Sequence, residues 1–303
     1  PRTVASTVPW EALGAEGRAF VAGGPTRAEI AAVAGRGREP VRVYVGLGGG
    51  GTPADRVRLA VAELERTGGF GRSVLAVVVP SGTGFVNPVA ADGLEYLHRG
   101  DTAIVAVQCS RRPSWLALPL DGADARETGR LLLEAVRARL ATIPASARPR
   151  LVLYGESIGA YGSEAALAPE ALGRVDRALW VGPPESSPLY RRLVTPDGRE
   201  PTTGAVRIAT GAADLAAAGP WPRPRILYLA HDDDPVVRWS PEIAVRRPPW
   251  LADDARWIPL VTFLHVSGAL VQGSVGDGPG HRYDAEIVAA WAAVTDPPVD
   301  PAA

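Results

Sequence analysis

The sequence predicts an α/β fold with a mostly parallel central sheet, helices on both faces and a lid-like insertion. Short apolar runs alternate with helical patterns along most of the 303 residues, as expected of strands joined by crossover helices. The runs are continuously apolar, which is typical of parallel strands buried on both faces. A Gly-Glu-Ser-Ile-Gly segment at 155–159 stands between one such run and a helical pattern.

The chain begins with a segment outside this alternation. Residues 1–40 are rich in Ala, Gly and Arg with a weak helical pattern, and predict an N-terminal arm packed on a main domain over 41–294. Residues 41–45 alternate as a strand does. A helix is expected from Pro53, because proline suits the first helical position.

The middle of the chain supplies the most apolar strands. Residues 73–79 and 102–107 are nearly continuous apolar runs, and a helix is expected between them over about 87–98. A long amphipathic helix is expected over 126–140. The strand 150–154 then leads into Gly-Glu-Ser-Ile-Gly, so strand and helix keep alternating.

The C-terminal half adds two strands, 178–181 and 226–230, and a final helix over 285–294. Between these strands, 183–225 lacks clear periodicity and carries much Pro, Gly and Ser, so a lid or insertion is expected there. Residues 295–303, with Asp-Pro-Pro and Asp-Pro, are expected to form a flexible tail.

Composition excludes several classes of function. A net charge of −1 and a pI near 6.6 give no electrostatic attraction to nucleic acid or to an acidic membrane surface. One cysteine, Cys109, excludes an internal disulfide. There is no signal-peptide pattern and no uncharged apolar stretch of about eighteen residues. We therefore expect a soluble chain without a nucleic-acid partner, and the lack of Met suggests an excised domain or a removed start Met.

Ser157 is the predicted nucleophile. A G-x-S-x-G pattern between a strand and a helix forms a nucleophile elbow, in which the serine lies on a strained turn. Gly155 and Gly159 let helix and strand approach closely enough to expose its oxygen. A helix over about 160–167 follows the pattern, which supplies the context that the elbow requires.

A serine hydroxyl needs a base within hydrogen-bond reach. His281 is the predicted base, because it opens the last helix from a glycine-rich loop and follows the order Ser, acid, His along the chain. His231, which adjoins three aspartates, is a weaker alternative. His98 ends a helix, where a cation is favourable, and His265 lies in an apolar run that predicts a core or pocket-wall residue.

The acid is expected in the loop after strand 226–230, where Asp232, Asp233 and Asp234 stand together. Its role is to hold the imidazole tautomer and to stabilise the imidazolium. Asp234 is the first choice, because Asp-Pro-Val-Val after that strand is a frequent hydrolase setting of the acid, and Asp233 is the second. A metal site on His231 and these aspartates lacks a second ligand cluster, so no metal is expected.

Two N–H donors are expected to stabilise the developing oxyanion. One is the N–H of Ile158, the residue after the nucleophile. The other should come from the glycine-containing loop after strand 73–79, with Thr83 the first choice and Gly82 the second; an ordinary tight turn is the alternative. The glycine loop 46–51 lacks the spacing of a phosphate cradle, so no cofactor is expected.

Several segments together resemble an α/β-hydrolase catalytic domain found in actinobacterial proteins, usually at the C-terminal end of a multi-pass membrane protein. The similarity spans about 40–294. The segments that carry it are 63–68, 80–84, 94–98, 155–159, 180–184, 234–237, 239–241 and 280–281. The resemblance implies a triad of Ser157, Asp234 and His281, and a membrane-tethered full-length protein.

Two departures from the family pattern bear on substrate choice. The glycine run 48–51 replaces more polar sequence, and 109–112 replaces a segment expected to carry an aromatic residue. The expected activity is hydrolysis of a carboxylic ester through an acyl-enzyme, with a small-molecule ester or a lipid-like or cell-envelope substrate as partner. The alternatives are an acyltransferase with the same triad and a non-catalytic binding module that retains the fold.

Overall fold

The computed structural model describes residues 6–167, 172, 175–198, 200–216, 221, 225–273 and 280–299. Its centre is a seven-stranded sheet in which every neighbouring pair is parallel. In spatial order the strands are β1 (Val41–Val45), β3 (Thr102–Val107), β2 (Val74–Val79), β4 (Arg150–Glu156), β5 (Arg177–Val181), β7 (Arg225–Leu229) and β6 (Val206–Ala209). Every residue of β2 and β3 is buried. The predicted α/β fold is confirmed.

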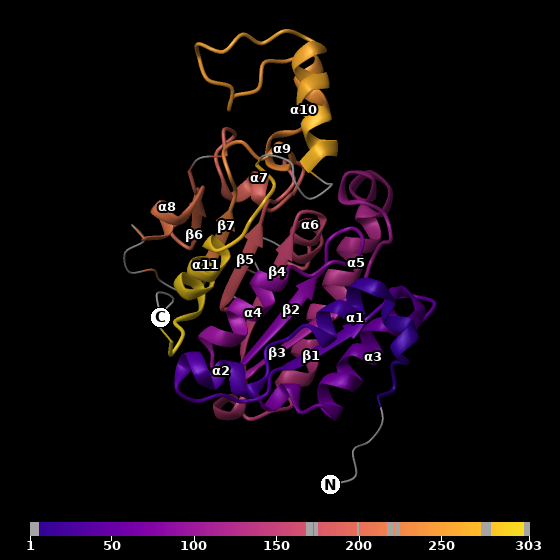
Figure 1. Cartoon of the computed structure of the whole chain (residues 1–303). Helices are drawn as coiled ribbons and strands as arrows, with labels where there is room; N and C mark the ends of the chain where they lie inside the picture. The colour runs from indigo at the N-terminus through magenta and orange to yellow at the C-terminus, as the bar shows by residue number, and fades with distance from the viewer. Residues whose placement is uncertain are drawn as a thin grey trace.

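Helices cover both faces of the sheet (Figure 1). On one face, α5 packs against both α3 and α6; on the other, α4 packs against α11. The bounds are α3 (Pro53–Arg66), α4 (Pro88–Leu97), α5 (Ser114–Ala141), α6 (Ile158–Glu164) and α11 (Glu286–Thr295). The 1–40 segment contains α1 (Gly14–Ala22), which lies against β1, and α2 (Arg27–Ala34).

The start of α3 agrees with the sequence pattern, and the start of α5 does not. α3 begins at Pro53 as expected, because Thr52 and Asp55 form a capping box before it. α5 begins at Ser114, twelve residues before the expected start at 126, and continues through Pro119. A proline inside a helix normally marks a break because it removes a backbone hydrogen bond. The helical periodicity that begins at 126 therefore predicts a shorter helix than the structure has.

The segment expected to be a lid, 183–225, contributes a strand to the sheet. Its β6 pairs with β7 at the sheet edge, and the short helices α7 (Tyr190–Leu193) and α8 (Ala212–Ala216) flank it. The two central residues of β6 are only half-buried, so no continuous apolar run marks the strand. Beyond the carboxyl ends of the strands stand α9 (Pro235–Arg238) and α10 (Val261–Gly273), which are packed together (Figure 1).

The C-terminal segment is held to the sheet beyond the end of α11. The Asp296 carboxylate accepts a hydrogen bond from Arg177 Nη2 at 2.9 Å and also pairs with Arg225. Residues 300–303 of the expected tail lie outside the described residues. None of the helices in the described ranges has both the length and the apolarity needed to cross a bilayer.

Candidate active site

Ser157 occupies a strained turn between β4 and α6. Its φ of 58° and ψ of −126° are unusual for a residue with a side chain, and such strain persists only where the surroundings enforce it. A Cβ on Gly155 would collide with the carbonyl of Gly159, and one on Gly159 would collide with the carbonyl of Val79. The two glycines are therefore required by close backbone approach, as the elbow pattern predicts.

Ser157 lines an apolar cavity of about 390 Å³. Although the residue is only 3% exposed, it contributes to the cavity wall. The wall is formed by α5, the start of α6, the loop after β5, α9 and α10. Its residues are Trp115, Leu118, Pro119, Ser157, Ile158, Tyr161, Pro184, Ser186, Val236, Trp239, Ser267, Leu270 and Val271.

Asp234 and His281 form a buried pair. His281 Nδ1 lies 2.8 Å from Asp234 Oδ2, and the carboxylate is fully buried. Two further donors hold that carboxylate: Val236 N at 2.7 Å from Oδ1, and the Tyr283 hydroxyl at 2.6 Å from Oδ2. Asp234 also caps α9, with Pro235 at its first position. Three hydrogen bonds therefore fix the carboxylate that orients the imidazole.

The other two aspartates of the loop lie elsewhere. Asp233 is exposed, and Asp232, whose side chain is 60% exposed, pairs with Arg238 at 2.6 Å. The hydrogen bond to His281 thus comes from Asp234, the first choice from the sequence.

The acidic groups around His281 change the pKa of its imidazole. Burial alone would lower the pKa of its imidazole, but the adjacent Asp234 carboxylate and, more weakly, Glu156 raise that pKa above its ordinary value. The imidazolium is the form that a general base produces when it accepts a proton. This environment is suited to stabilising it.

The loop after β5 brings the elbow and the His–Asp pair together. Ser157 N donates to Val181 O at 2.9 Å. A Cβ on the next residue, Gly182, would lie 2.8 Å from His281 Cε1 and 3.0 Å from Asp234 Oδ2. In the part of the chain that the structure describes, the Ser157 hydroxyl itself forms no hydrogen bond; such bonds often tighten only when substrate binds.

Glu156 is a second acid beside this group, and it is half-buried. Its Oε2 accepts from Asn87 Nδ2 at 3.1 Å and from the Tyr154 hydroxyl at 3.0 Å. Burial raises the pKa of the Glu156 carboxyl, and the nearby His281 opposes that shift. Sequence reasoning missed Glu156, Gly182 and Tyr283.

The predicted oxyanion donors lie near the elbow. Ile158 is the first residue of α6 and is fully buried. Gly82 and Thr83 lie in a turn closed by Gly84 N donating to Ser81 O at 2.8 Å. That turn follows Pro80, whose carbonyl oxygen would lie 3.0 Å from a Cβ on Gly159. The catalytic role of these N–H groups stays a prediction.

The remaining histidines have other partners. His231 Nδ1 lies 3.0 Å from Gly280 O and Nε2 lies 3.0 Å from Glu286 Oε1, so both ring nitrogens are engaged. His98 is buried 2.9 Å from Thr295 Oγ1, and burial, reinforced by Arg150, lowers its pKa to about 3.

The expectation that His265 is a core or pocket-wall residue is wrong. Its side chain is exposed on α10, a helix that stands out from the body of the domain (Figure 1).

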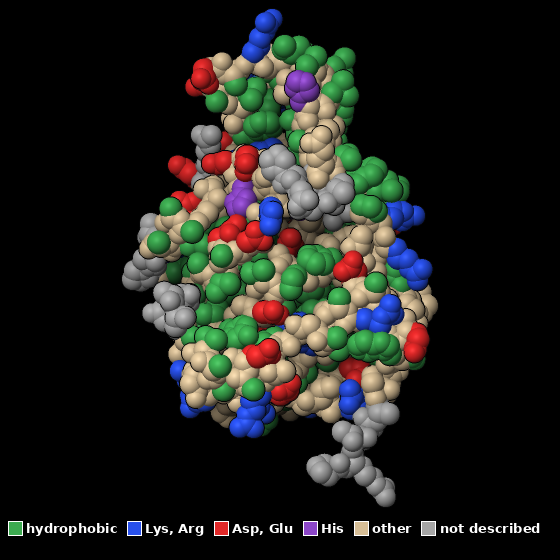
Figure 2. All heavy atoms as spheres, viewed as in Figure 1, with side chains coloured by type: hydrophobic (Ala, Val, Ile, Leu, Met, Phe, Trp, Pro, Cys, Tyr) green, Lys and Arg blue, Asp and Glu red, His purple; other side chains and the backbone are tan. Residues whose placement is uncertain are grey.

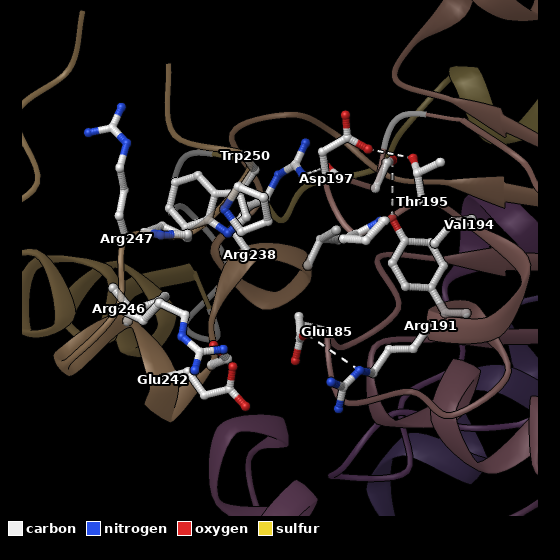
Figure 3. Close-up of a pocket in the computed structure, with 18 residues that line it drawn as sticks. Glu185, Arg191, Val194, Thr195, Asp197, Arg238, Glu242, Arg246, Arg247 and Trp250 are labelled. Carbon is white, nitrogen blue, oxygen red and sulfur yellow. Dashed lines mark hydrogen bonds and ion pairs between the residues drawn. The ribbon is translucent and has the colours of Figure 1, made fainter. Parts of the chain in front are cut away.

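A second cavity, of about 480 Å³, lies beside α9 (Figure 3). Its wall includes Glu185, Val237 and Arg238. Their neighbours in the chain, Pro184, Ser186, Val236 and Trp239, line the Ser157 cavity instead. Oppositely charged groups lie on this wall, among them Arg191 and Glu185 at 3.7 Å. Ser157, Asp234 and His281 do not line it, so the larger cavity lies apart from the candidate site.

Comparison with known proteins identifies one family. A family model described as the alpha/beta-hydrolase family matches residues 41–302, which is most of the chain. Among solved structures, an acetylxylan esterase matches at 14% identity and a TM-score of 0.34, covering 55% of this chain and 84% of that one.

A Trichoderma reesei cutinase in complex with a C11Y4 phosphonate inhibitor matches at 14% identity and a TM-score of 0.33, covering 72% of this chain and 84% of that one. At these TM-scores neither structure bears on what the chain does. A search of curated proteins gives no match.

Proposed function

This chain belongs to the α/β-hydrolase family, and we propose that it is a serine hydrolase that cleaves a carboxylic ester through an acyl-enzyme on Ser157. The observation that carries the proposal is the strained serine at φ 58°, joined through the β5 loop to a buried Asp–His pair with a 2.8 Å hydrogen bond. Enzymes that use a serine nucleophile combine these parts, because each is ineffective alone.

In the first half-reaction, Ser157 Oγ attacks the ester carbonyl carbon and His281 Nε2 accepts the hydroxyl proton. Asp234 stabilises the resulting imidazolium through Nδ1–H. The carbonyl oxygen becomes an oxyanion, which the N–H groups of Ile158 and of Thr83 or Gly82 stabilise. When the carbon–oxygen bond to the alcohol breaks, the alcohol oxygen takes the proton from His281 Nε2.

In the second half-reaction, His281 removes a proton from water, which attacks the acyl-enzyme carbonyl. Collapse of this intermediate releases the carboxylic acid and returns the proton to Ser157 Oγ. Acyl transfer would follow the same steps with an alcohol in place of water.

The apolar cavity supports a substrate with an apolar acyl group. Trp115, Leu118, Leu270 and Val271 belong to its wall, and burial of apolar surface would favour a lipid-like acyl chain over a polar one. We therefore propose esters with an aliphatic acyl chain as the substrate class.

The test is hydrolysis of p-nitrophenyl butyrate by the wild type and by Ser157→Ala. We expect turnover by the wild type and a loss of about 10³-fold or more in kcat for the variant. Ser73→Ala, an exposed serine at the opposite end of the sheet, is the matched control and should keep its rate. A properly folded wild type that fails on esters of every chain length would favour a binding module, and transfer to added alcohol in preference to water would favour an acyltransferase.

A further inference from the structure

The large hydrophobic side chains that the described residues expose are not scattered. Most of them lie in two segments, 115–120 and 245–271, which flank the Ser157 cavity. Figure 2 shows hydrophobic atoms gathered on the projecting part of the molecule that carries α10. A contiguous patch of exposed apolar side chains on a globular protein marks an interaction site. From these two segments we define the apolar surface as six residues: Trp115, Leu120, Leu260, Val261, Leu264 and Val271.

The helix at the centre of the apolar surface has His265 as its one titratable side chain. Over its thirteen residues, α10 has no Asp, Glu, Lys or Arg. Leu264 is 63% exposed and Leu260, just before the helix, is 62% exposed. A surface helix that packs only against its own domain normally presents a charged outer face to water, and α10 does not.

The inner side of α10 is fixed to the catalytic region. Trp239 Nε1 donates to Ser267 Oγ at 2.9 Å, and the Trp239 ring contacts Phe263 with centroids 6.0 Å apart. Trp239 and Ser267 both line the Ser157 cavity. One helix therefore forms a wall of the cavity on one side and an exposed apolar surface on the other.

The apolar surface is continuous with the cavity. Trp115 and Val271 both line the cavity, yet they are 38% and 43% exposed, so they mark where it reaches the surface. A protein partner seated on these residues would cover the entrance to Ser157. A lipid surface would instead bring acyl chains to that entrance.

The charges beside α10 decide the kind of lipid. Between residues 240 and 260, the three acids Glu242, Asp253 and Asp254 balance the three arginines Arg246, Arg247 and Arg256. Attraction to anionic headgroups needs an excess of basic groups, and this segment has none. Its burial in lipid would therefore depend on apolar contact alone.

Building on the proposed function, we propose that the apolar surface docks α10 onto a neutral lipid surface, from which an acyl ester enters the Ser157 cavity. α10 projects beyond the carboxyl ends of the strands (Figure 1), away from the body of the domain. Leu260, Val261 and Leu264 contact the lipid, and Trp115 and Val271 flank the entrance.

The experiment measures co-sedimentation with phosphatidylcholine vesicles, using Ser157→Ala so that hydrolysis cannot alter the lipid. We expect Ser157→Ala to bind, and Leu264→Asp in that background to lose at least about tenfold in the partition coefficient, because a charge replaces a leucine that the lipid would bury. Val33→Asp is the matched control, since Val33 is 53% exposed on α2 at the other end of the molecule; it should bind like the parent. Thermal midpoints of both variants verify folding.

Four results would overturn the proposal: no binding to phosphatidylcholine, equal binding by Leu264→Asp, binding only when anionic lipid is present, or a dimer that Leu264→Asp dissociates, which would assign the surface to a second copy. Because binding is measured without catalysis, vesicle binding by a protein that hydrolyses no ester would uphold the docking of α10 on lipid while refuting the proposed function.

Discussion

Replacing Asp234 by Asn tests the pairing on which the proposed chemistry depends. The carboxylate accepts from three donors: His281 Nδ1, the Tyr283 hydroxyl and Val236 N. An amide has one accepting oxygen and one donating NH₂ group. If the oxygen keeps the bond to Val236, the NH₂ group faces His281 and Tyr283. The imidazole must then accept at Nδ1 and carry its proton on Nε2, which removes the base.

The expected loss follows from that tautomer. We expect kcat on p-nitrophenyl butyrate to fall about 10⁴-fold, equivalent to about 5.5 kcal/mol of barrier. The free energy of unfolding should fall by only about 1–3 kcal/mol, since size is kept and one buried donor loses its acceptor. Initial-rate kinetics and urea denaturation measure the two quantities.

The neighbouring aspartates provide the control. Asp233→Asn should be nearly silent because Asp233 is exposed, and Asp232→Asn should lose only its pairing with Arg238. The reasoning fails if Asp233→Asn is as damaging as Asp234→Asn, or if Asp234→Asn keeps a tenth of the wild-type kcat.

Three further predictions concern the same group. Tyr283→Phe removes one donor to Asp234 and should lower kcat about tenfold with His281 still competent; an unchanged rate would mean that the bond does not position the carboxylate. Gly182→Ala adds a Cβ 2.8 Å from His281 Cε1 at a φ of 51°, and should cost at least about 100-fold in kcat; near-wild-type kinetics would contradict the close approach. Asp234 raises the pKa of His281, and the base must be neutral to accept a proton. The pH below which kcat/KM falls should therefore lie above the ordinary pKa of histidine and move to lower pH in Asp234→Asn. A fall that stays at the same pH in the variant would assign it to another group.

Local patterns predicted the parts whose geometry is set by adjacent residues. The elbow is one, because Gly155 and Gly159 determine how closely strand and helix approach. The α3 start is another, since its capping box involves residues three apart. The hydrogen bond between Asp234 and His281 joins two residues that the sequence singled out, one in the loop after strand 226–230 and the other in the loop before the last helix.

What the sequence did not predict depends on contacts between distant segments. Gly182 is 99 residues before His281 in the chain but lies against its ring, and the Tyr283 hydroxyl reaches Asp234 across 49 residues. β6 has no continuous apolar run because it is an edge strand. The apolar run of α10 resembles a core segment, and only its position outside the body reveals exposure.

The most direct test of Ser157 as the nucleophile is labelling with a fluorophosphonate probe, followed by intact-mass measurement and peptide mapping. The account predicts one adduct per chain, on Ser157, and no adduct in Ser157→Ala. Labelling that persists in Ser157→Ala, or an adduct mapped to another residue of the folded wild type, would contradict it.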